Sequence, residues 1–529
     1  MSSKDISSVR PSVPRRVIKK RGTTRERTGC VTCRQRKKRC DLGYPVCREC
    51  VRLNYMCKWE EPRSVTQSSS STKSITSTND VTNAPFRLFG TPDPILFWVD
   101  EHADCTSPSS RRHFLRYYTQ TFTHLLTTNI ENNSFLSGMS TGELSGWSQM
   151  LIYKLVFLPM AMHSPPLLNT LIAWSSSHLS LRDRSFQQVA IQNRCVALSD
   201  LRGALDLDPT NIEANLAMSL VLCSLESIMA DNGAAWYQHL VGAAGVISAN
   251  TPKSVLDGAS SIELLKPFED AHSGRWLLRN FAYRDIVMAV ARDQAPLLNS
   301  QHFLKLDESR MPDSHFGLAS EILVILSDIT ALNEKVKGII STSSTTTRDD
   351  PAFIDDTASV NELLIELETQ TRFQSLESHL NQWVCPPSTD TSLRLLAETY
   401  RSSALIHLYR TQRRAFPSQV EDLSLKATAQ AASIVETIEQ MPTRSLPECT
   451  LLFPIFLAGG EATAESHIKV IRDRMLDMIE SRGFRNVGVA LSVLEKLWRL
   501  KIARKSAGSP VRVDWLDIVQ QDGVELSLS

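Results

Sequence analysis

The sequence predicts a mainly α-helical protein in which a small cysteine-rich, metal-binding module is joined by a disordered linker to a large all-helical domain. Three observations lead to this class. Six of the eleven cysteines fall between residues 30 and 57, a Ser/Thr-rich run follows them, and apolar residues then recur mainly at helical spacing. The chain of 529 residues is long enough for about two to four domains.

The N-terminal arm, residues 1–29, is polar and basic and shows no apolar periodicity, so we expect it to be disordered. Its stretch "RRVIKKR" suits a nuclear-import signal or an arm that rests on phosphates, and the sequence does not separate the two. Residues 1–58 hold 17 Lys and Arg against 4 acidic residues, a net +13, whereas the remainder of the chain is −12. A basic head on an acidic body predicts a module that binds a polyanion, with nucleic acid as the leading candidate.

Neither secretion nor a membrane is indicated by the apolar segments. The first residues lack the apolar core of a signal peptide, so an oxidising compartment is not expected. The best membrane candidate, "MLIYKLVFLPMAM", is too short to span and contains Lys154 and Pro159. We therefore expect a soluble, intracellular protein without a membrane partner.

The cysteines of residues 30–57 form a duplicated ligand pattern. Their spacing is Cys30-x2-Cys33-x6-Cys40-x6-Cys47-x2-Cys50-x6-Cys57. Thiolates bind Zn²⁺ or an iron–sulfur cluster, and structural zinc takes four ligands in a closed tetrahedron. Six thiolates complete two tetrahedra only if two sulfurs bridge both metals, so the pattern predicts two Zn²⁺ per chain. A disulfide knot suits an unsignalled chain badly, and an iron–sulfur cluster would leave two thiolates unused.

The segment resembles the fungal Zn(II)2Cys6 binuclear cluster of sequence-specific transcription factors, and it fits that ligand pattern at every cysteine. The resemblance implies that one zinc is held by Cys30, Cys33, Cys40 and Cys47. It implies that the other zinc is held by Cys30, Cys47, Cys50 and Cys57. Cys30 and Cys47 would then be the bridging ligands. A zinc module without nucleic-acid contact would leave the +13 charge unexplained.

Basic residues crowd the stretch "CVTCRQRKKRC", where residues after Cys33 are expected to form a short helix that starts at the metal. Arg and Lys suit the major groove because they bond the O6 and N7 acceptors of guanine. The resemblance implies that Lys37 and Arg36 contact guanines of a CGG-type triplet in double-stranded DNA. The residues expected to hold phosphates or to pack on the cluster are Arg34, Lys38, Arg39, Arg48 and Arg52.

Residues 58–109 form the predicted Ser/Thr-rich linker, and residues 110–505 form the predicted all-helical regulatory domain, divided by a loop at 341–359. Three stretches resemble the all-helical fungal-specific transcription factor domain. They are "LPMAMHSPPLLNTLIAWSSSHL", "AWYQHLVGAAGVI" and "LLFPIFLAGGEATAESH".

Within this domain, the residues that could suggest a binding or catalytic site are better explained by helix packing. Trp236, Leu240 and Ala243 fit one buried helix face, and His163 and His178 are expected to be satisfied rather than metal ligands. "LAGGEATAE" lacks the spacing of a phosphate loop and predicts close helix packing. No nucleophile or metal-protease motif is found, so we do not expect an enzyme.

The C-terminal tail, residues 506–529, leaves two alternatives open. "VDWLDIVQQDGVELSLS" mixes acidic and large apolar residues, as in activation segments that fold on a coactivator. Alternatively, it is a last helix that docks through Trp515, Leu516 and Val519.

We therefore expect a nuclear DNA-binding transcription factor of RNA polymerase II promoters, which activates a metabolic or secondary-metabolite pathway together with transcription coactivators. The alternative is a chromatin-associated scaffold whose zinc cluster positions it on DNA without sequence preference. No sustained heptad pattern lies between 58 and 110, so a homodimer and a single-triplet reader both remain open, as does a small-molecule effector.

Overall fold

The computed structural model describes residues 32–33, 36–40, 108–128, 152–231, 233–250, 268–269, 271–305, 312–345, 356–506 and 512–529. The chain divides into two compact units, Met1–Arg87 and Leu88–Ser529. The second unit is helical throughout its described part, where the one β pairing is an isolated bridge between Asp313 and Gly317. The mainly α-helical class is thereby confirmed.

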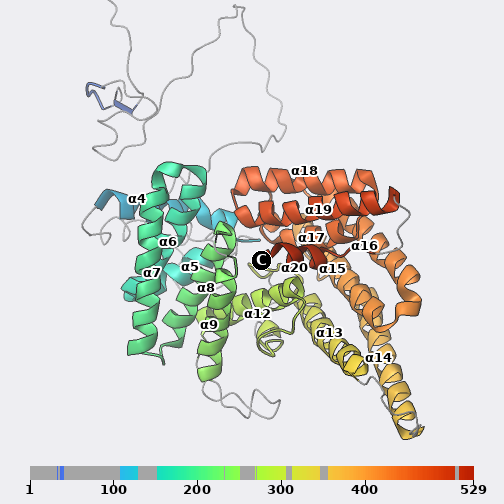
Figure 1. Ribbon diagram of the computed structural model, residues 1–529. Coiled ribbons are helices and arrows are strands. Elements are labelled where there is room, and N and C mark those ends of the chain that lie inside the picture. The colour runs from blue at the N-terminus through green and yellow to red at the C-terminus, as the bar shows by residue number, and fades with distance from the viewer. Residues whose placement is uncertain are drawn as a thin grey trace, which may run out of the picture. The chain divides into compact units, whose positions relative to one another are not determined.

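A first group of helices lies on one side of the second unit, and α12 leads from it toward the middle (Figure 1). The group comprises α4 (Pro108–Gln120), η1 (Phe122–Leu125), α5 (Ile152–His163), α6 (Pro165–Arg182), η4 (Arg184–Phe186), α7 (Gln187–Leu207), α8 (Ile212–Met229) and α9 (Ala235–Ala249). Within it, α6 packs on α7 and α8 on α9. Helix α12 is His272–Arg292 and contacts both α8 and α9.

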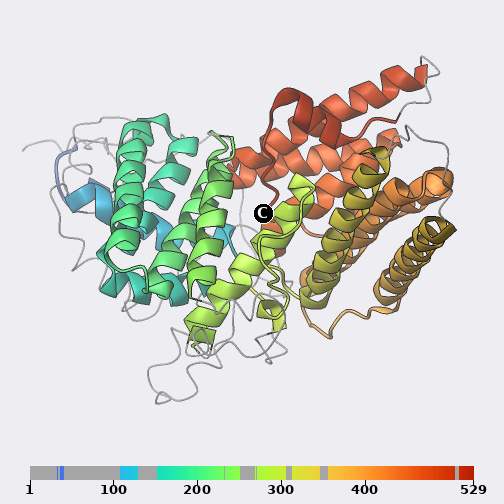
Figure 2. The ribbon, with the colours of Figure 1, turned by 60° about the horizontal axis from the view of Figure 1, so that its bottom comes forward.

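A second group lies on the other side of α12, as the turned view in Figure 2 also shows. It comprises η5 (Phe303–Lys305), α13 (Ser320–Thr345), α14 (Asp356–Gln382), α15 (Thr391–Ala415), η6 (Pro417–Gln419), α16 (Val420–Gln440), η7 (Leu446–Thr450), α17 (Leu452–Glu461), α18 (Glu465–Arg482), α19 (Arg485–Ser506) and α20 (Trp515–Asp522). Its most extensively packed pair is α15 with α16. One continuous apolar core runs through both groups, so they fold as a single unit.

Several helices begin where the sequence supplies a capping side chain. Ser164 accepts a hydrogen bond from the Leu167 N–H at 3.4 Å, and the next two residues are prolines, which suit a first helical turn. Asp390 caps α15 in the same way, and Asp514 forms a capping box with Asp517 at the start of α20. These capping residues explain why a new helix begins at each of these short polar segments.

Helix α8 is long and apolar enough to cross a membrane by length and composition. Its most apolar window is, however, 83% buried inside the fold. Every residue from Asn215 to Met229 is buried against neighbouring helices. A helix that is apolar all round is expected at the centre of a large domain, and α8 occupies that position.

The two glycines of "LAGGEATAE" allow α17 to approach its neighbours closely. A Cβ on Gly459 would lie 2.6 Å from a methyl carbon of Leu494 on α19. A Cβ on Gly460 would lie 3.0 Å from the indole of Trp515 on α20. The predicted close helix packing is confirmed, and it requires residues without a side chain at these two positions.

The sequence-based boundaries differ from the observed ones in two places. Helix α13 continues to Thr345 and α14 starts at Asp356, so at most residues 346–355 separate the two helices within the expected loop 341–359. The Ser341 hydroxyl donates to the Lys337 carbonyl at 3.0 Å, which lets a serine stay in the helix. The helical fold also extends past residue 505, because Trp515, Leu526 and Leu528 are buried in the core. The tail is thus the docked helix of the two alternatives.

A buried carboxylate joins the segment before α20 to the rest of the second group. Glu461, at the end of α17, accepts hydrogen bonds from Arg413 at 2.7 and 3.1 Å and from Arg512 at 2.6 Å. Arg410 approaches it at 3.7 Å and also pairs with Asp514 at 2.7 Å. Burial by itself raises the pKa of Glu461, but hydrogen bonding and charge from Arg413, then the other guanidinium groups, bring that pKa below its ordinary value.

Replacing Glu461 by glutamine should lower the free energy of unfolding of the full chain by about 3–5 kcal/mol, because buried guanidinium groups lose their shared partner. Urea unfolding followed by far-UV circular dichroism measures this. Glu495→Gln is the matched control, since Glu495 pairs with Arg472 at the surface and its loss should cost at most about 1 kcal/mol. Equal losses in the two variants would contradict the assignment of Glu461 as the central partner.

Candidate nucleic-acid interface and metal centre

The structure describes part of the cysteine-rich segment, residues 32–33 and 36–40. The predicted site residues within this part are Cys33, Arg36, Lys37, Lys38, Arg39 and Cys40. The other predicted site residues lie outside the described residues: Cys30, Arg34, Cys47, Arg48, Cys50, Arg52 and Cys57.

A single helical turn brings Cys33 and the basic residues together. Thr32 and Cys33 are helical, and the Arg36 N–H donates to the Thr32 carbonyl at 3.2 Å, one turn back. The Lys38 N–H then donates to the Cys33 carbonyl at 3.0 Å across six residues, and Lys37 between them has φ +55°. This combination is the Schellman motif that ends a helix. The turn therefore contains Cys33 and ends at Arg36, whereas the sequence predicted a helix that follows Cys33.

Lys37 occupies a backbone position that usually belongs to glycine or asparagine. A lysine there costs of order 1 kcal/mol relative to an ordinary conformation. Because Lys37 is left-handed, the chain changes direction after the helical turn, and Lys38 and Arg39 connect this turn to Cys40. Backbone strain of this kind tends to be kept where it positions a functional side chain.

Three of the four cations of this turn are exposed, Arg36 is half-buried, and the first thiol is buried. Lys37, Lys38 and Arg39 are exposed, and none forms an ion pair with a residue that the structure describes. Cys33 is fully buried and Cys40 is partly buried. An enclosed thiol on one side and exposed cations on the other are what a closed structural zinc site beneath a DNA-binding surface requires.

In the helical unit, the apolar side chains and His178 that were singled out from sequence are structural, whereas His163 is exposed. Trp236, Leu240 and Ala243 are buried in the core as predicted. The ring of His178 contacts the Tyr117 hydroxyl at 2.9 Å and the Arg482 carbonyl at 2.7 Å. Burial lowers the pKa of His178 to about 4, so its ring is neutral near pH 7. Of the described residues, no group of three His, Cys, Asp or Glu side chains could hold a metal.

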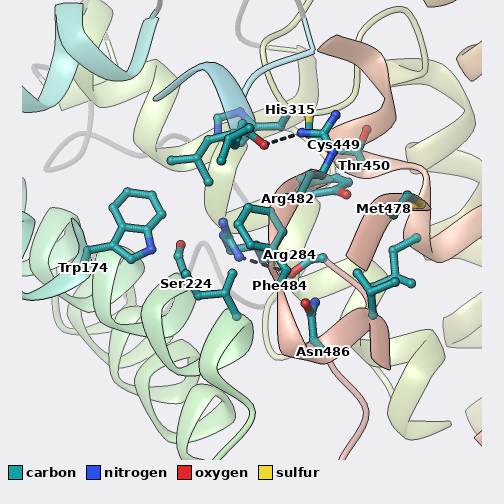
Figure 3. A pocket seen from close by; sticks show the side chains of 17 residues that line it. Trp174, Ser224, Arg284, His315, Cys449, Thr450, Met478, Arg482, Phe484 and Asn486 are labelled. Atoms are coloured by element: carbon teal, nitrogen blue, oxygen red, sulfur yellow. Dashed lines mark hydrogen bonds between the residues drawn. The ribbon is translucent and has the colours of Figure 1, made fainter. Parts of the chain in front are cut away.

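The sequence reasoning missed a cavity between the two helix groups, which we call the central cavity (Figure 3). Figure 3 shows Trp174 and Ser224 on one side and Asn486 on the other, with Arg284 between them. Its volume is about 50 Å³, room for a few water molecules. An arginine in the apolar run "NFAYRDIVMAV" of α12 was the signal available in the sequence.

Comparison with known proteins agrees with the two units. The Fungal Zn(2)-Cys(6) binuclear cluster domain matches residues 28–65, and the Fungal specific transcription factor domain matches residues 113–529. The first of these domains binds two zinc ions, so Zn²⁺ is the cofactor of the N-terminal segment. No solved structure matches the chain.

Three curated relatives show how the similarity is distributed. The transcriptional activator protein UGA3 of Saccharomyces cerevisiae is 25% identical over 58% of this chain and 64% of its own length. An uncharacterized transcriptional regulatory protein of Schizosaccharomyces pombe is 21% identical over 95% of this chain and 97% of its own. The zinc cluster transcription factor CZF1 of Candida albicans is 58% identical over only 40 residues, 8% of this chain and 10% of its own. Since one family match covers most of the chain and the other covers its cysteine-rich segment, the protein belongs to the fungal zinc cluster transcription factors.

Proposed function

We propose that the protein reads CGG-type triplets in promoter DNA and activates transcription of a metabolic or secondary-metabolite pathway in the nucleus. The observation that carries the DNA contact is the helical turn at Cys33, which ends at Arg36 before a left-handed Lys37 and leaves Lys37, Lys38 and Arg39 exposed. Lys37 and Arg36 contact guanine edges, while Lys38 and Arg39 hold phosphates together with Arg34, Arg48 and Arg52.

We further propose that the six cysteines of residues 30–57 are the zinc ligands, with Cys30 and Cys47 bridging both ions. What supports this is the enclosed thiol of Cys33, and six thiolates satisfy two tetrahedra only by sharing two sulfurs. The ions supply folding energy to a segment too small for a core of its own, and they aim the basic side chains. Activation rather than repression is supported by the printed name of UGA3, a transcriptional activator.

Removing zinc from the full chain should abolish sequence-specific DNA binding while leaving its helical circular dichroism nearly unchanged. The reason is that the cluster stabilises residues 30–57, whereas the helical unit has a separate core. Treatment with 1,10-phenanthroline, with released zinc measured by absorption spectroscopy, should yield two ions per chain. Adding zinc back should restore binding, and full DNA binding by the metal-free chain would contradict the proposal.

Replacing Lys37 by glycine should lower the preference for the target site over random DNA by about 10- to 100-fold, because a base contact is worth about 1–3 kcal/mol. Glycine suits the left-handed backbone, so it removes the side chain without disturbing the end of the turn. Fluorescence anisotropy titrations over a range of salt measure the effect. Lys38→Ala is the matched control and should weaken both kinds of DNA alike while flattening the salt slope by about one unit. An unchanged preference in Lys37→Gly would show that Lys37 does not read a base.

Selection of bound sites from random double-stranded DNA with the full-length protein should enrich a CGG-type triplet. Two triplets at fixed spacing would indicate a homodimer, because half-site spacing mirrors the symmetry of the protein. A single triplet would indicate a monomeric reader. Retention of DNA with steep salt dependence but without an enriched sequence would instead support the scaffold alternative.

A further inference from the structure

Helix α7 exposes more large apolar side chains than any other helix that the structure describes. Of the fourteen exposed large apolar side chains among the described residues, five lie on its 21 residues. They are Ile191, Val196, Leu198, Leu205 and Leu207. The helix packs on α6 and contacts α8, and it lies on the side of the first group away from α12 (Figure 1). Exposed apolar surface gathered on one element is typical of an interaction site.

Three of these side chains form a regular row along the helix. Ile191, Leu198 and Leu205 follow one another at intervals of seven residues and are 46, 42 and 37% exposed. Cys195 and Arg202, both exposed, complete the row at alternating steps of four and three residues. This alternation is the a/d pattern with which two helices pack along their length.

The row does not belong to the core of the helical unit. The core-facing side chains of α7 are Ala190, Ala197 and Leu201. At about 100° per residue, they lie about a quarter of a turn from the centre of the row. The helix thus has one apolar face that is used within the fold and a second that remains exposed.

The charges of α7 cancel. Its charged side chains are Arg194, Asp200, Arg202 and Asp206, and Arg194 is paired with Glu226 of α8 at 2.7 Å. A nucleic acid or an anionic lipid surface would require an excess of Lys and Arg, which this helix lacks. Two copies of a face without net charge meet without electrostatic repulsion, so the charge favours a second copy of this chain as the partner.

The row also has the symmetry that a pair of identical chains requires. Ile191 and Leu205 each lie seven residues from Leu198. A two-fold axis at Leu198, with the two helices antiparallel, brings Ile191 of one copy opposite Leu205 of the other and the two Leu198 side chains together. Three apolar layers form in this way, as in an isologous interface, where each contact occurs twice.

We propose that the exposed row of α7 is a homodimer interface, in which α7 packs antiparallel against α7 of a second copy. The row forms an apolar patch on the order of a few hundred Å², smaller than the about 800 Å² per partner of a standard stable interface. The dimer is therefore reversible and forms at micromolar concentration. The inference concerns the helical unit and does not depend on which DNA sequence the zinc cluster reads.

Arg202 limits the strength of this pair. It is the one charged side chain in the row, is 87% exposed and lies 4.0 Å from Asp206. In the antiparallel pair it approaches Arg194 of the partner subunit, whose charge is paired with Glu226. The stem of Arg202 covers part of the apolar row while its guanidinium stays in water. A polar side chain within an a/d row nevertheless lowers the stability of the pair.

Sedimentation velocity of the full-length protein without DNA tests the proposal, over a concentration range of about 1–100 µM. A reducing agent is present, so that a disulfide through the exposed Cys195 does not form. We expect the mean mass to rise with concentration from 59.2 kDa toward twice that value. A mass of 59.2 kDa at every concentration would overturn the proposal.

The variant Leu198→Glu should raise the Kd of the dimer at least about tenfold, because it brings two like charges together at the two-fold axis. Leu207→Glu is the matched control, since Leu207 is 88% exposed on the same helix and lies about half a turn from the row. It should leave the Kd unchanged. Thermal unfolding followed by circular dichroism checks that both variants keep the fold. A dimer of unchanged Kd in Leu198→Glu would overturn the proposal.

A gain of association covers the case in which Leu198→Glu disturbs the fold. Arg202→Leu completes the apolar row and should lower the Kd of the dimer about tenfold. Arg499→Leu removes an exposed charge on α19 instead and should leave the Kd unchanged. Equal or weaker association of Arg202→Leu relative to the wild-type chain would overturn the proposal without reference to Leu198.

Discussion

Beyond its first turn, helix α12 has no face in contact with bulk water, and this constraint governs the helical unit. Its residues from Trp276 to Ala291 are all buried, so it forms the shared wall between the two helix groups. Such a helix is expected to be wholly apolar, yet it carries Arg279, Arg284 and Asp285. Each of these groups needs a partner inside the protein, because bulk water hardly reaches them.

Two of the three charges find their partners in the segments that follow α12. Arg279 pairs with Asp313, and Asp285 accepts hydrogen bonds from the backbone of Leu297 and Leu298 at 2.8 and 3.1 Å. Burial nevertheless raises the pKa of Asp285 to about 7, even though these two bonds favour its charged form. The charges therefore fix the path of the chain as it leaves α12, and Arg284 is the member of the set that faces an open space.

Sequence reasoning predicted the helical class, the buried face around Trp236 and the close packing at Gly459, because periodicity and residue size are local properties. It did not find the partners of α12, since pairing between Arg279 and Asp313 depends on how distant segments meet. The left-handed backbone of Lys37 was equally hidden, because such positions are normally marked by glycine or asparagine. The Ser/Thr composition near residue 341 suggested a loop, but the hydroxyl of Ser341 bonds back to its own helix.

The burial of α8 has a consequence for synthesis on the ribosome. Its Ser227 is hydrogen-bonded to Ser527, which lies 300 residues further along the chain. At about 5–20 residues per second, those residues take roughly 15–60 s to emerge. During this time the helix, apolar enough to span a membrane, lacks part of its final cover. The nascent protein therefore presents a long hydrophobic segment before all the residues that enclose it exist, and exposed surface of this kind is what chaperones shield.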